Sequence, residues 1–145
     1  MLPPIKSGWR YLFVLCLIPG ILVACGSSST SGGSLTGVTW QLTNVKFDGQ
    51  STNSIISEPD QYTITFQTDG TATVKADCNM AHLTYTTNGN QLTIKAGPMT
   101  LVYCGTASLS NEFVQALQVA TAYTVQGSTL TINSGSNGSM DFKQG

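Results

Sequence analysis

The fold is decided by the stretch YTITFQTDGTATVKA, residues 62–76. Apolar residues alternate with polar ones, mostly threonine, on both sides of Asp69-Gly70. This period of two is typical of strands with one buried face. The Asp-Gly pair between the two runs is a turn signal that joins neighbouring antiparallel strands. The stretch therefore predicts a β-hairpin with one apolar face.

The same alternation continues outward from this hairpin in both directions. The further runs are 38–42, 83–85, 92–94, 123–125, 129–132 and 139–142. Turn signals such as Asn88-Gly89 separate several of them. Short antiparallel strands with one apolar face predict a curled sheet or barrel. Residues 49–60 lack the pattern, and we expect a long loop there.

One segment changes from the strand period to a helix period. Its apolar residues recur at Leu109, Phe113, Ala116, Leu117 and Ala120. This spacing predicts an amphipathic helix over 109–121 that packs on the sheet. Ser108 or Ser110 is expected to cap it, with Glu112 in the first turn. The predicted fold class is α+β, mainly β: an antiparallel curled sheet or barrel with one packed helix.

The N-terminus has the layout of an export signal. Lys6 and Arg10 precede an apolar run over 11–18, and Leu22-Val23-Ala24-Cys25 follows. From Tyr11 to Ala24 there are 14 residues, whereas a membrane-spanning helix needs about 20. A basic start and a short apolar run describe a secretory signal peptide over 1–24. The four residues ending at Cys25 resemble the bacterial lipobox.

The lipobox resemblance implies that Cys25 receives a lipid and becomes the first residue after cleavage. The thiol suits this role because a thiolate is the nucleophile that forms a thioether. An ordinary signal peptide with a chance cysteine is the alternative. Residues 25–34, which are rich in Gly and Ser, have the composition of a flexible tether. Residues 35–145 are long enough for one domain with one core.

The charge of residues 25–145 limits the classes of partner. Four lysines stand against seven acidic residues, a side-chain net charge of −3. No basic stripe exists, so we expect no nucleic-acid partner. There is also no polybasic patch for lipid head groups, so the lipid on Cys25 must provide the membrane attachment.

Two cysteines remain in the domain after export, Cys78 and Cys104. In an oxidising compartment they most simply form a disulfide. The alternatives are free thiols or a zinc site, in which His82 and Asp77 would complete the ligand set. The spacing matches no tight zinc signature, so we expect no metal and no other cofactor.

The sequence contains no recognisable catalytic constellation. His82 is its one histidine, and no serine lies in a Gly-x-Ser-x-Gly turn. The seven acidic residues are scattered rather than paired. We therefore expect a surface position for His82 and no enzymatic activity.

The aromatic residues fall largely on inward positions of the predicted strands, and core packing is the simplest interpretation. The alternative is a small-ligand pocket at a barrel mouth. Its candidate ligand-binding residues are Tyr85 and Tyr103, because a phenol needs a polar neighbour.

The order of these elements resembles the META domain family, which includes the HslJ-like heat-inducible bacterial lipoproteins. The resemblance begins at residues 35–42 and continues through 64–66, Asp69-Gly70 and Cys78-Asn79. It then includes the runs 89–94, 99–104 and 112–117, and it closes at Tyr123, Gly127 and Leu130. It implies a barrel-like antiparallel sheet with one helix, an envelope or stress-linked role, and no established catalytic activity.

Two departures from the family pattern stand out. Asp77 occupies a position where the family usually has glycine, and residues 100–104 replace the family's Thr-x-Met-Ala-Cys run. Asp tolerates a left-handed backbone better than most residues, so we expect Asp77 to adopt one.

Together these features predict a lipid-anchored, non-catalytic module on the extracytoplasmic side of a bacterial cell envelope. The outer membrane is expected where the bacterium has one, because Gly26 follows the cysteine. The expected partners are the membrane, through Cys25, and an unknown envelope protein. The alternative function is a small-ligand-binding module that uses a barrel mouth.

Overall fold

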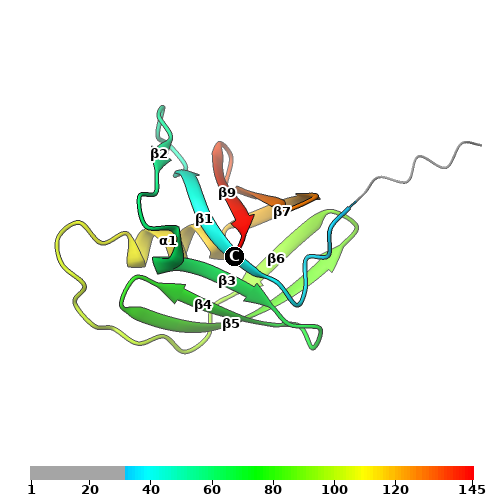
Figure 1. Ribbon diagram of the computed structural model, residues 1–145, viewed down its shortest axis with the longest axis horizontal. Helices are drawn as coiled ribbons and strands as arrows, with labels where there is room; N and C mark the ends of the chain where they lie inside the picture. The colour runs from blue at the N-terminus through cyan, green and yellow to red at the C-terminus, as the bar shows by residue number, and fades with distance from the viewer. Residues whose placement is uncertain (1–31) are drawn as a thin grey trace, which may run out of the picture.

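The computed structural model describes residues 32–145 (Figure 1). Its elements, in chain order, are β1 (Thr39–Lys46), β2 (Ser54–Ile55), the 3-10 helix η1 (Pro59–Gln61), β3 (Tyr62–Phe66), β4 (Thr71–Ala76), β5 (Asn79–Asn88), β6 (Gln91–Lys95), α1 (Ser110–Gln118), β7 (Ala120–Gln126), β8 (Thr129–Ser134) and β9 (Gly138–Gln144).

Eight strands close into an antiparallel barrel. The order around it is β1-β3-β4-β5-β6-β7-β8-β9, and β9 pairs back with β1. The hairpin predicted over residues 62–76 is β3–β4, with Ile64 opposite Val74. The prediction of a mainly β fold with one helix is confirmed, and the curled sheet is a closed barrel.

The second half of β1 leaves β3 and pairs with the two-residue strand β2 on the same side. The expectation of a long loop over 49–60 therefore needs correction. The segment includes β2 and most of η1, and Ile56 within it is buried. Ile56 N–H donates to Thr43 O at 3.0 Å, which ties the segment to β1. Alternation could not predict β2, because two residues are too few to show a period.

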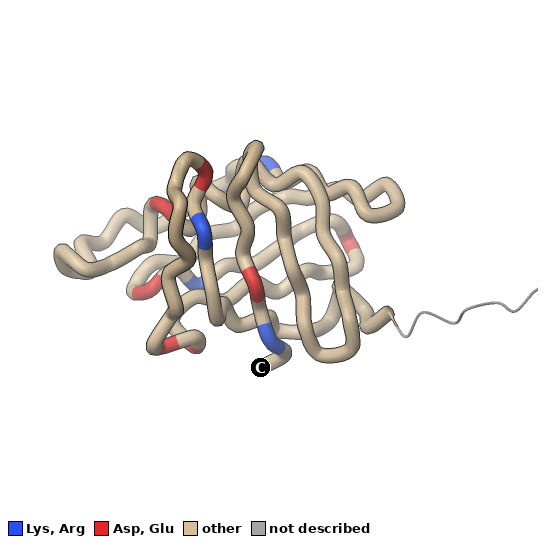
Figure 2. Tube along the Cα trace, turned by 90° about the horizontal axis from the view of Figure 1, so that it is seen from above, with Lys and Arg blue, Asp and Glu red and all other residues tan. Residues whose placement is uncertain are grey.

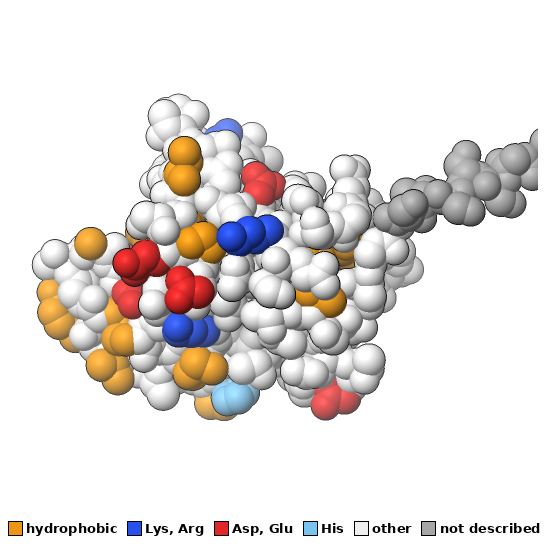
Figure 3. Space-filling view, viewed as in Figure 1, with side chains coloured by type: hydrophobic (Ala, Val, Ile, Leu, Met, Phe, Trp, Pro, Cys, Tyr) orange, Lys and Arg blue, Asp and Glu red, His pale blue; other side chains and the backbone are white. Residues whose placement is uncertain are grey.

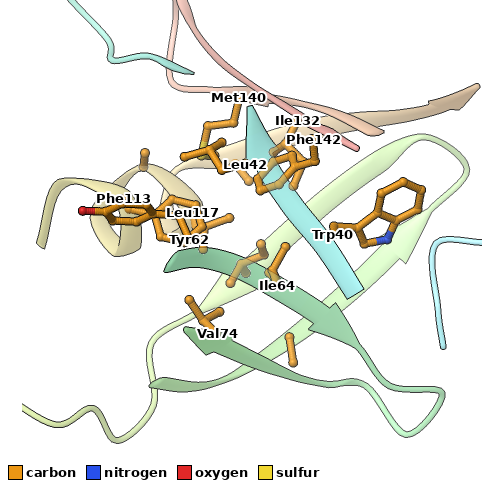
Figure 4. Close-up of a cluster of buried hydrophobic side chains, with 14 of the residues drawn as sticks. Trp40, Leu42, Tyr62, Ile64, Val74, Phe113, Leu117, Ile132, Met140 and Phe142 are labelled. Atoms are coloured by element: carbon orange, nitrogen blue, oxygen red, sulfur yellow. The ribbon is translucent and has the colours of Figure 1, made fainter. Parts of the chain in front are cut away.

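The apolar face of each strand points into the barrel and fills it. Side chains such as Trp40, Ile64 and Phe142 are almost fully buried there (Figure 4). Threonines occupy many outward positions, and Thr39 and Thr65 Oγ1 lie 3.1 Å apart on that surface. This arrangement is the expected one for a pleated sheet with one wet face.

The strands run between two ends that differ in construction. We call the first the helix end, which carries α1 and the loops 47–61, 77–78, 101–109 and 135–137. We call the second the turn end, which carries the turns 67–70, 89–90 and 127–128 and the incoming segment 32–38. Figure 1 shows the beginning of the described chain, in blue, and the 101–109 loop, in yellow, at opposite ends of the molecule.

Helix α1 covers the barrel at the helix end. It contacts β4, β6 and β8, strands from different parts of the wall. Phe113 is fully buried, and its ring meets the Tyr62 ring edge-on with centroids 5.7 Å apart. Burial of Val114 and Leu117 completes the inward face, which confirms the predicted amphipathic helix.

The helix boundaries and cap differ from the prediction. The helix begins at Ser110 and ends at Gln118, inside the predicted range 109–121. Its N-cap is Leu109, which makes no side-chain capping bond, so neither predicted serine caps it. Ser108 Oγ instead accepts from Ser110 N–H at 3.2 Å. The predicted range ended three residues too late because Ala120 fits the helix period, yet Ala120 begins β7.

The turn end is closed by the incoming chain. Leu35 is buried there, and its carbonyl accepts a hydrogen bond from Trp40 Nε1 at 2.9 Å. Gly37 N–H donates to Phe66 O at 3.0 Å, which fixes this segment along β3. Both barrel mouths are therefore covered, one by α1 and the other by Leu35 and Trp40.

Candidate functional site

The candidate site is built on the corner between β4 and β5. Asp77, which is in this corner, has a φ of +59°, which confirms the left-handed conformation expected from the sequence. Its N–H donates to Gln61 O at 2.7 Å, so the corner is tied to η1. This turn brings Cys78 and Asn79 to the helix end, beside the loop that precedes α1.

Cys78 and Cys104 form a disulfide with Cα atoms 5.7 Å apart. The bond joins the β4–β5 corner to the 101–109 loop, across a sequence separation of 26 residues. It therefore holds a long loop against the barrel wall at one point.

Asn79 holds the same loop at a second point. Its side chain is only 2% exposed. Its Oδ1 accepts from Val102 N–H at 2.8 Å, and its Nδ2 donates to Val102 O at 2.9 Å. The amide thus pairs with both polar groups of one backbone residue, as a neighbouring strand would. Oδ1 also accepts from Thr100 Oγ1, and Nδ2 lies 3.2 Å from Ser110 Oγ.

Because the Val102 backbone faces Asn79, the side chains around it are directed away from the barrel. Leu101, Val102 and Tyr103 are 84%, 60% and 78% exposed. We call these three residues the apolar tip. Tyr103 therefore lies outside the core, contrary to the expectation that the aromatic residues pack inward. Three consecutive exposed apolar side chains held by buried polar contacts are typical of an interaction site.

Exposed large apolar side chains gather at this end of the molecule. Within residues 32–145 they are the apolar tip, Ile55, Met80 and Val119, all of which lie at the helix end. Figure 3 shows the hydrophobic surface concentrated at the side where the 101–109 loop protrudes. None of these residues lies at the turn end, so the two ends of the barrel differ in how much apolar surface they expose.

Two surface hollows flank the loop. One has a volume of about 280 Å³ and is lined by the apolar tip, Asn79 and Asn111 among others. The other has a volume of about 360 Å³ and lies between β2 and the loop. Ile55 and Leu109 provide apolar surface to the second hollow, while Glu58 and Asp77 provide carboxylates.

Acidic residues are also concentrated at the helix end. Five of the seven lie there: Asp48, Glu58, Asp60, Asp77 and Glu112. The lysines at this end are Lys46 and Lys75, which leaves a local side-chain charge of −3. The other charged residues of the described chain are two acidic residues and two lysines, which balance. Figure 2 shows the charges along the chain.

The structure does not bring the candidate zinc ligands together. Cys78 and Cys104 are bonded to each other. Across residues 32–145, no three His, Cys, Asp or Glu side chains are grouped as metal ligands would be. His82 is exposed on the outer face of β5, where its backbone N–H donates to Pro98 O at 2.9 Å.

Tyr85 and Tyr103, the candidate ligand-binding residues, lie at opposite ends of the barrel. The Tyr85 hydroxyl donates to Gln67 O at 2.7 Å, and its ring packs edge-on against Phe66. Desolvation of the phenol, with a smaller effect from Asp69, raises the pKa of Tyr85 above its usual 10.0. Tyr85 therefore belongs to the packing of the turn end, and it shares no site with Tyr103.

Cys25 and the predicted signal peptide over 1–24 lie outside the described residues. Within the described range, no helix is both long and apolar enough to cross a membrane.

Asn79, Met80 and Ile55 were not predicted from the sequence as parts of the site. A signal for Asn79 was available, because it occupies an inward position of the alternation that continues through Ala81 and Leu83. A polar residue at an inward strand position must find hydrogen-bond partners. Its partners come from a loop 20 or more residues away, and no local pattern identifies them.

Comparison with known proteins gives a family and a fold. The META domain family model matches residues 33–145. An NMR structure of a protein from Burkholderia xenovorans is similar at 19% identity and a TM-score of 0.62, covering 77% of this chain and 83% of that one. A DUF4847 family protein from Bacteroides vulgatus is similar at 18% identity and a TM-score of 0.56, covering 75% and 93%. These two likenesses concern the fold, and no curated protein matches the sequence.

Proposed function

The chain belongs to the META domain family, and from this premise we propose that it is a lipid-anchored, non-catalytic binding module of a bacterial cell envelope. In this proposal the lipid on Cys25 attaches it to the extracytoplasmic face of a membrane. The outer membrane is the proposed location where the bacterium has one. Its work is to hold an envelope protein, in support of the envelope under stress.

The observation that carries the proposal is the apolar tip. Leu101, Val102 and Tyr103 expose apolar surface to water, outside a core that other side chains already fill. Asn79 and the disulfide fix the loop before any partner arrives. A preformed apolar surface lowers the entropy cost of association, which favours a binding role.

The position of the tip also supports the proposal. The incoming segment at the start of the described chain and the 101–109 loop lie at opposite ends of the barrel (Figure 1). A domain held near residue 25 by its lipid would therefore present the tip away from the attachment point. Cys78 and Cys104, the two cysteines of the described residues, are bonded to each other and so provide no free thiol nucleophile. This favours a binding role over catalysis.

The alternative of a small ligand in a barrel mouth has less support. Buried side chains fill the barrel interior, and both mouths are covered. The hollows beside the loop lie on the surface and contain the disulfide or its neighbours. The structure therefore offers a protein partner a better surface than it offers a small molecule.

Chemical crosslinking in living cells tests the binding role. Lipidated, tagged protein would be crosslinked in its host, with a tag-only lipoprotein as control and mass spectrometry as readout. We expect one reproducible envelope protein above the control, and its loss in a Leu101→Ser/Tyr103→Ser variant. A correctly anchored, folded protein that captures nothing beyond the control would contradict the binding role.

Radiolabelled palmitate tests the anchor separately. We expect the label to enter the wild-type chain and not the Cys25→Ala variant. Label in the variant would show that Cys25 is not the lipidated residue.

A further inference from the structure

We propose that the helix end docks a basic amphipathic segment of an extracytoplasmic protein. An apolar face of that segment packs on the apolar tip and in the hollow between β2 and the loop, and its Lys or Arg side chains meet Glu58 and Asp77. The inference rests on the proposed binding function and names the chemistry of the partner.

The apolar surface continues from the tip into the hollow between β2 and the loop. The hollow of about 360 Å³ lies between Ile55 and Leu109, and Cys104 on its wall directly follows Tyr103 of the tip. Ile55 is 88% exposed, so it adds an apolar wall that nothing covers within the described residues. The apolar tip beside an open hollow suits a partner that inserts one apolar side chain into the hollow and packs others on the tip.

The same hollow has an acidic rim. Glu58 and Asp77 line the hollow itself, and Asp60 lies in η1 at the same end. No lysine lines this hollow. Cations on the partner would bring opposite charges together as the apolar surfaces meet, which speeds encounter and fixes orientation.

The same charges disfavour two other occupants of the surface. An anionic bilayer would be repelled by an end with a local charge of −3, and the lysines needed to attract it are absent from the hollow. A second copy of this chain would bring either a like-charged helix end or a turn end with one acidic residue and one lysine, Asp69 and Lys143. Neither provides a basic rim.

Peptide binding tests the inference directly. The lipidated full chain would be placed in phosphatidylcholine nanodiscs, with empty nanodiscs as the blank. The probes are a labelled amphipathic helical peptide of Leu and Lys, and its twin with Glu in place of every Lys. Fluorescence anisotropy would give the Kd of each at low and high salt. We expect the Lys peptide to bind at least about tenfold more tightly, and its binding to weaken as salt screens the charges.

Matched variants locate the binding. Glu58→Gln/Asp77→Asn removes two carboxylates while Asn still tolerates the left-handed backbone. Its control is Asp69→Asn at the turn end, which keeps a side-chain oxygen for Thr71. Leu101→Ser/Tyr103→Ser removes the tip, and its control is Val119→Ser, an exposed apolar residue that lines neither hollow beside the loop. Each double variant is expected to weaken the Lys peptide severalfold, and each control to leave it unchanged.

Equal binding of the two peptides, or equal losses in the variants and their controls, would overturn the inference. A blue shift of Tyr103→Trp emission when phosphatidylglycerol replaces phosphatidylcholine would assign the tip to lipid and overturn it too. These failures are distinct from failure of the binding role. Crosslinking that depends on the tip, together with peptides that bind equally, would preserve the binding role and reject only the basic partner.

Discussion

The two ends of the barrel are closed by different means, and the difference separates structure from function. The turn end is made of short hairpin turns and a buried Leu35, and its contacts are mostly between residues close in sequence or on adjacent strands. The helix end depends on long-range contacts, such as those from Asn79 to residues 100–110. It also displays the exposed apolar residues and most of the acidic ones. Local turn chemistry explains the first end, while the second has surface features that folding alone does not require.

Removing the ring that closes the helix end should have the largest effect. Phe113 is fully buried between the barrel and α1, so Phe113→Ala is expected to lower the free energy of unfolding by about 3–5 kcal/mol. Chemical denaturation measures the change, with Glu112→Ala on the exposed face of the same helix as control. An unchanged midpoint would mean that α1 does not close the barrel.

Removing the disulfide tests how far the helix end depends on covalent attachment. The loop it closes spans 26 residues, so Cys78→Ser/Cys104→Ser is expected to lower the free energy of unfolding by about 3–4 kcal/mol in the chain-entropy model. The intact mass of exported wild-type protein gives the control, since it should lack two hydrogens relative to the reduced form. Two thiols that alkylate without reductant would rule out the bond.

Asn79→Ala tests whether Asn79 holds the 101–109 loop while the rest of the barrel stays folded. It leaves Val102 N–H and C=O without their partner, and a loss of about 1–3 kcal/mol is expected. Limited proteolysis should then cut within 101–109 faster than in wild type, while the turn end stays resistant. Asn88→Ala, an exposed asparagine near the turn end, is the matched control. Equal proteolysis of the two variants would contradict the role given to Asn79.

Substitutions at Asp77 should change the free energy of unfolding according to how well the new residue tolerates a left-handed backbone. Its φ of +59° is left-handed, so Asp77→Gly is expected to raise the free energy of unfolding by up to about 1 kcal/mol. Asp77→Val should lower it, because a β-branched side chain is strained in that conformation. The same sign of effect for both variants would argue that the corner is not under this constraint.

Protonation of Asp69 at the turn end should have the smallest effect on stability, and the direction of that effect is known. Hydrogen bonds from the Thr71 hydroxyl and N–H hold the pKa of Asp69 below its usual 3.8. A folded-state pKa below the unfolded value contributes stability above the unfolded pKa, and the contribution is lost as pH falls through the folded pKa. NMR titration of the carboxyl carbon should give a midpoint below 3.8, and a midpoint at or above that value would contradict the bonds.

How much could be predicted from sequence also differs between the ends. Alternation around Ile64 and Val74 predicted the strands, because one face of each is buried. Alternation could not predict the irregularity between Leu42 and Asn44, which turns Val45 inward. The short strands with one apolar face and the family resemblance, which the match to the META domain model confirms, both indicated a barrel. The departure of Asp77 from the family's usual glycine indicated its left-handed conformation.

The candidate site was harder to predict because its contacts span the sequence. Leu101, Val102 and Tyr103 form a short apolar run, which on its own indicates burial. Their exposure follows from Asn79, whose amide occupies the Val102 backbone and directs the loop outward. Sequence reasoning found the cysteines, since residue type alone suggests their chemistry, and it missed the residues that depend on geometry.

The most direct test of the central claim is position-resolved photo-crosslinking in the native host. A photoreactive phenylalanine would replace Tyr103 at the helix end in one strain and Asn88 near the turn end in another, with lipidation and expression matched. We expect a discrete crosslinked envelope protein from position 103 and none from position 88. The same product from both positions, or a product from position 88 alone, would contradict the assignment of the binding surface to the helix end.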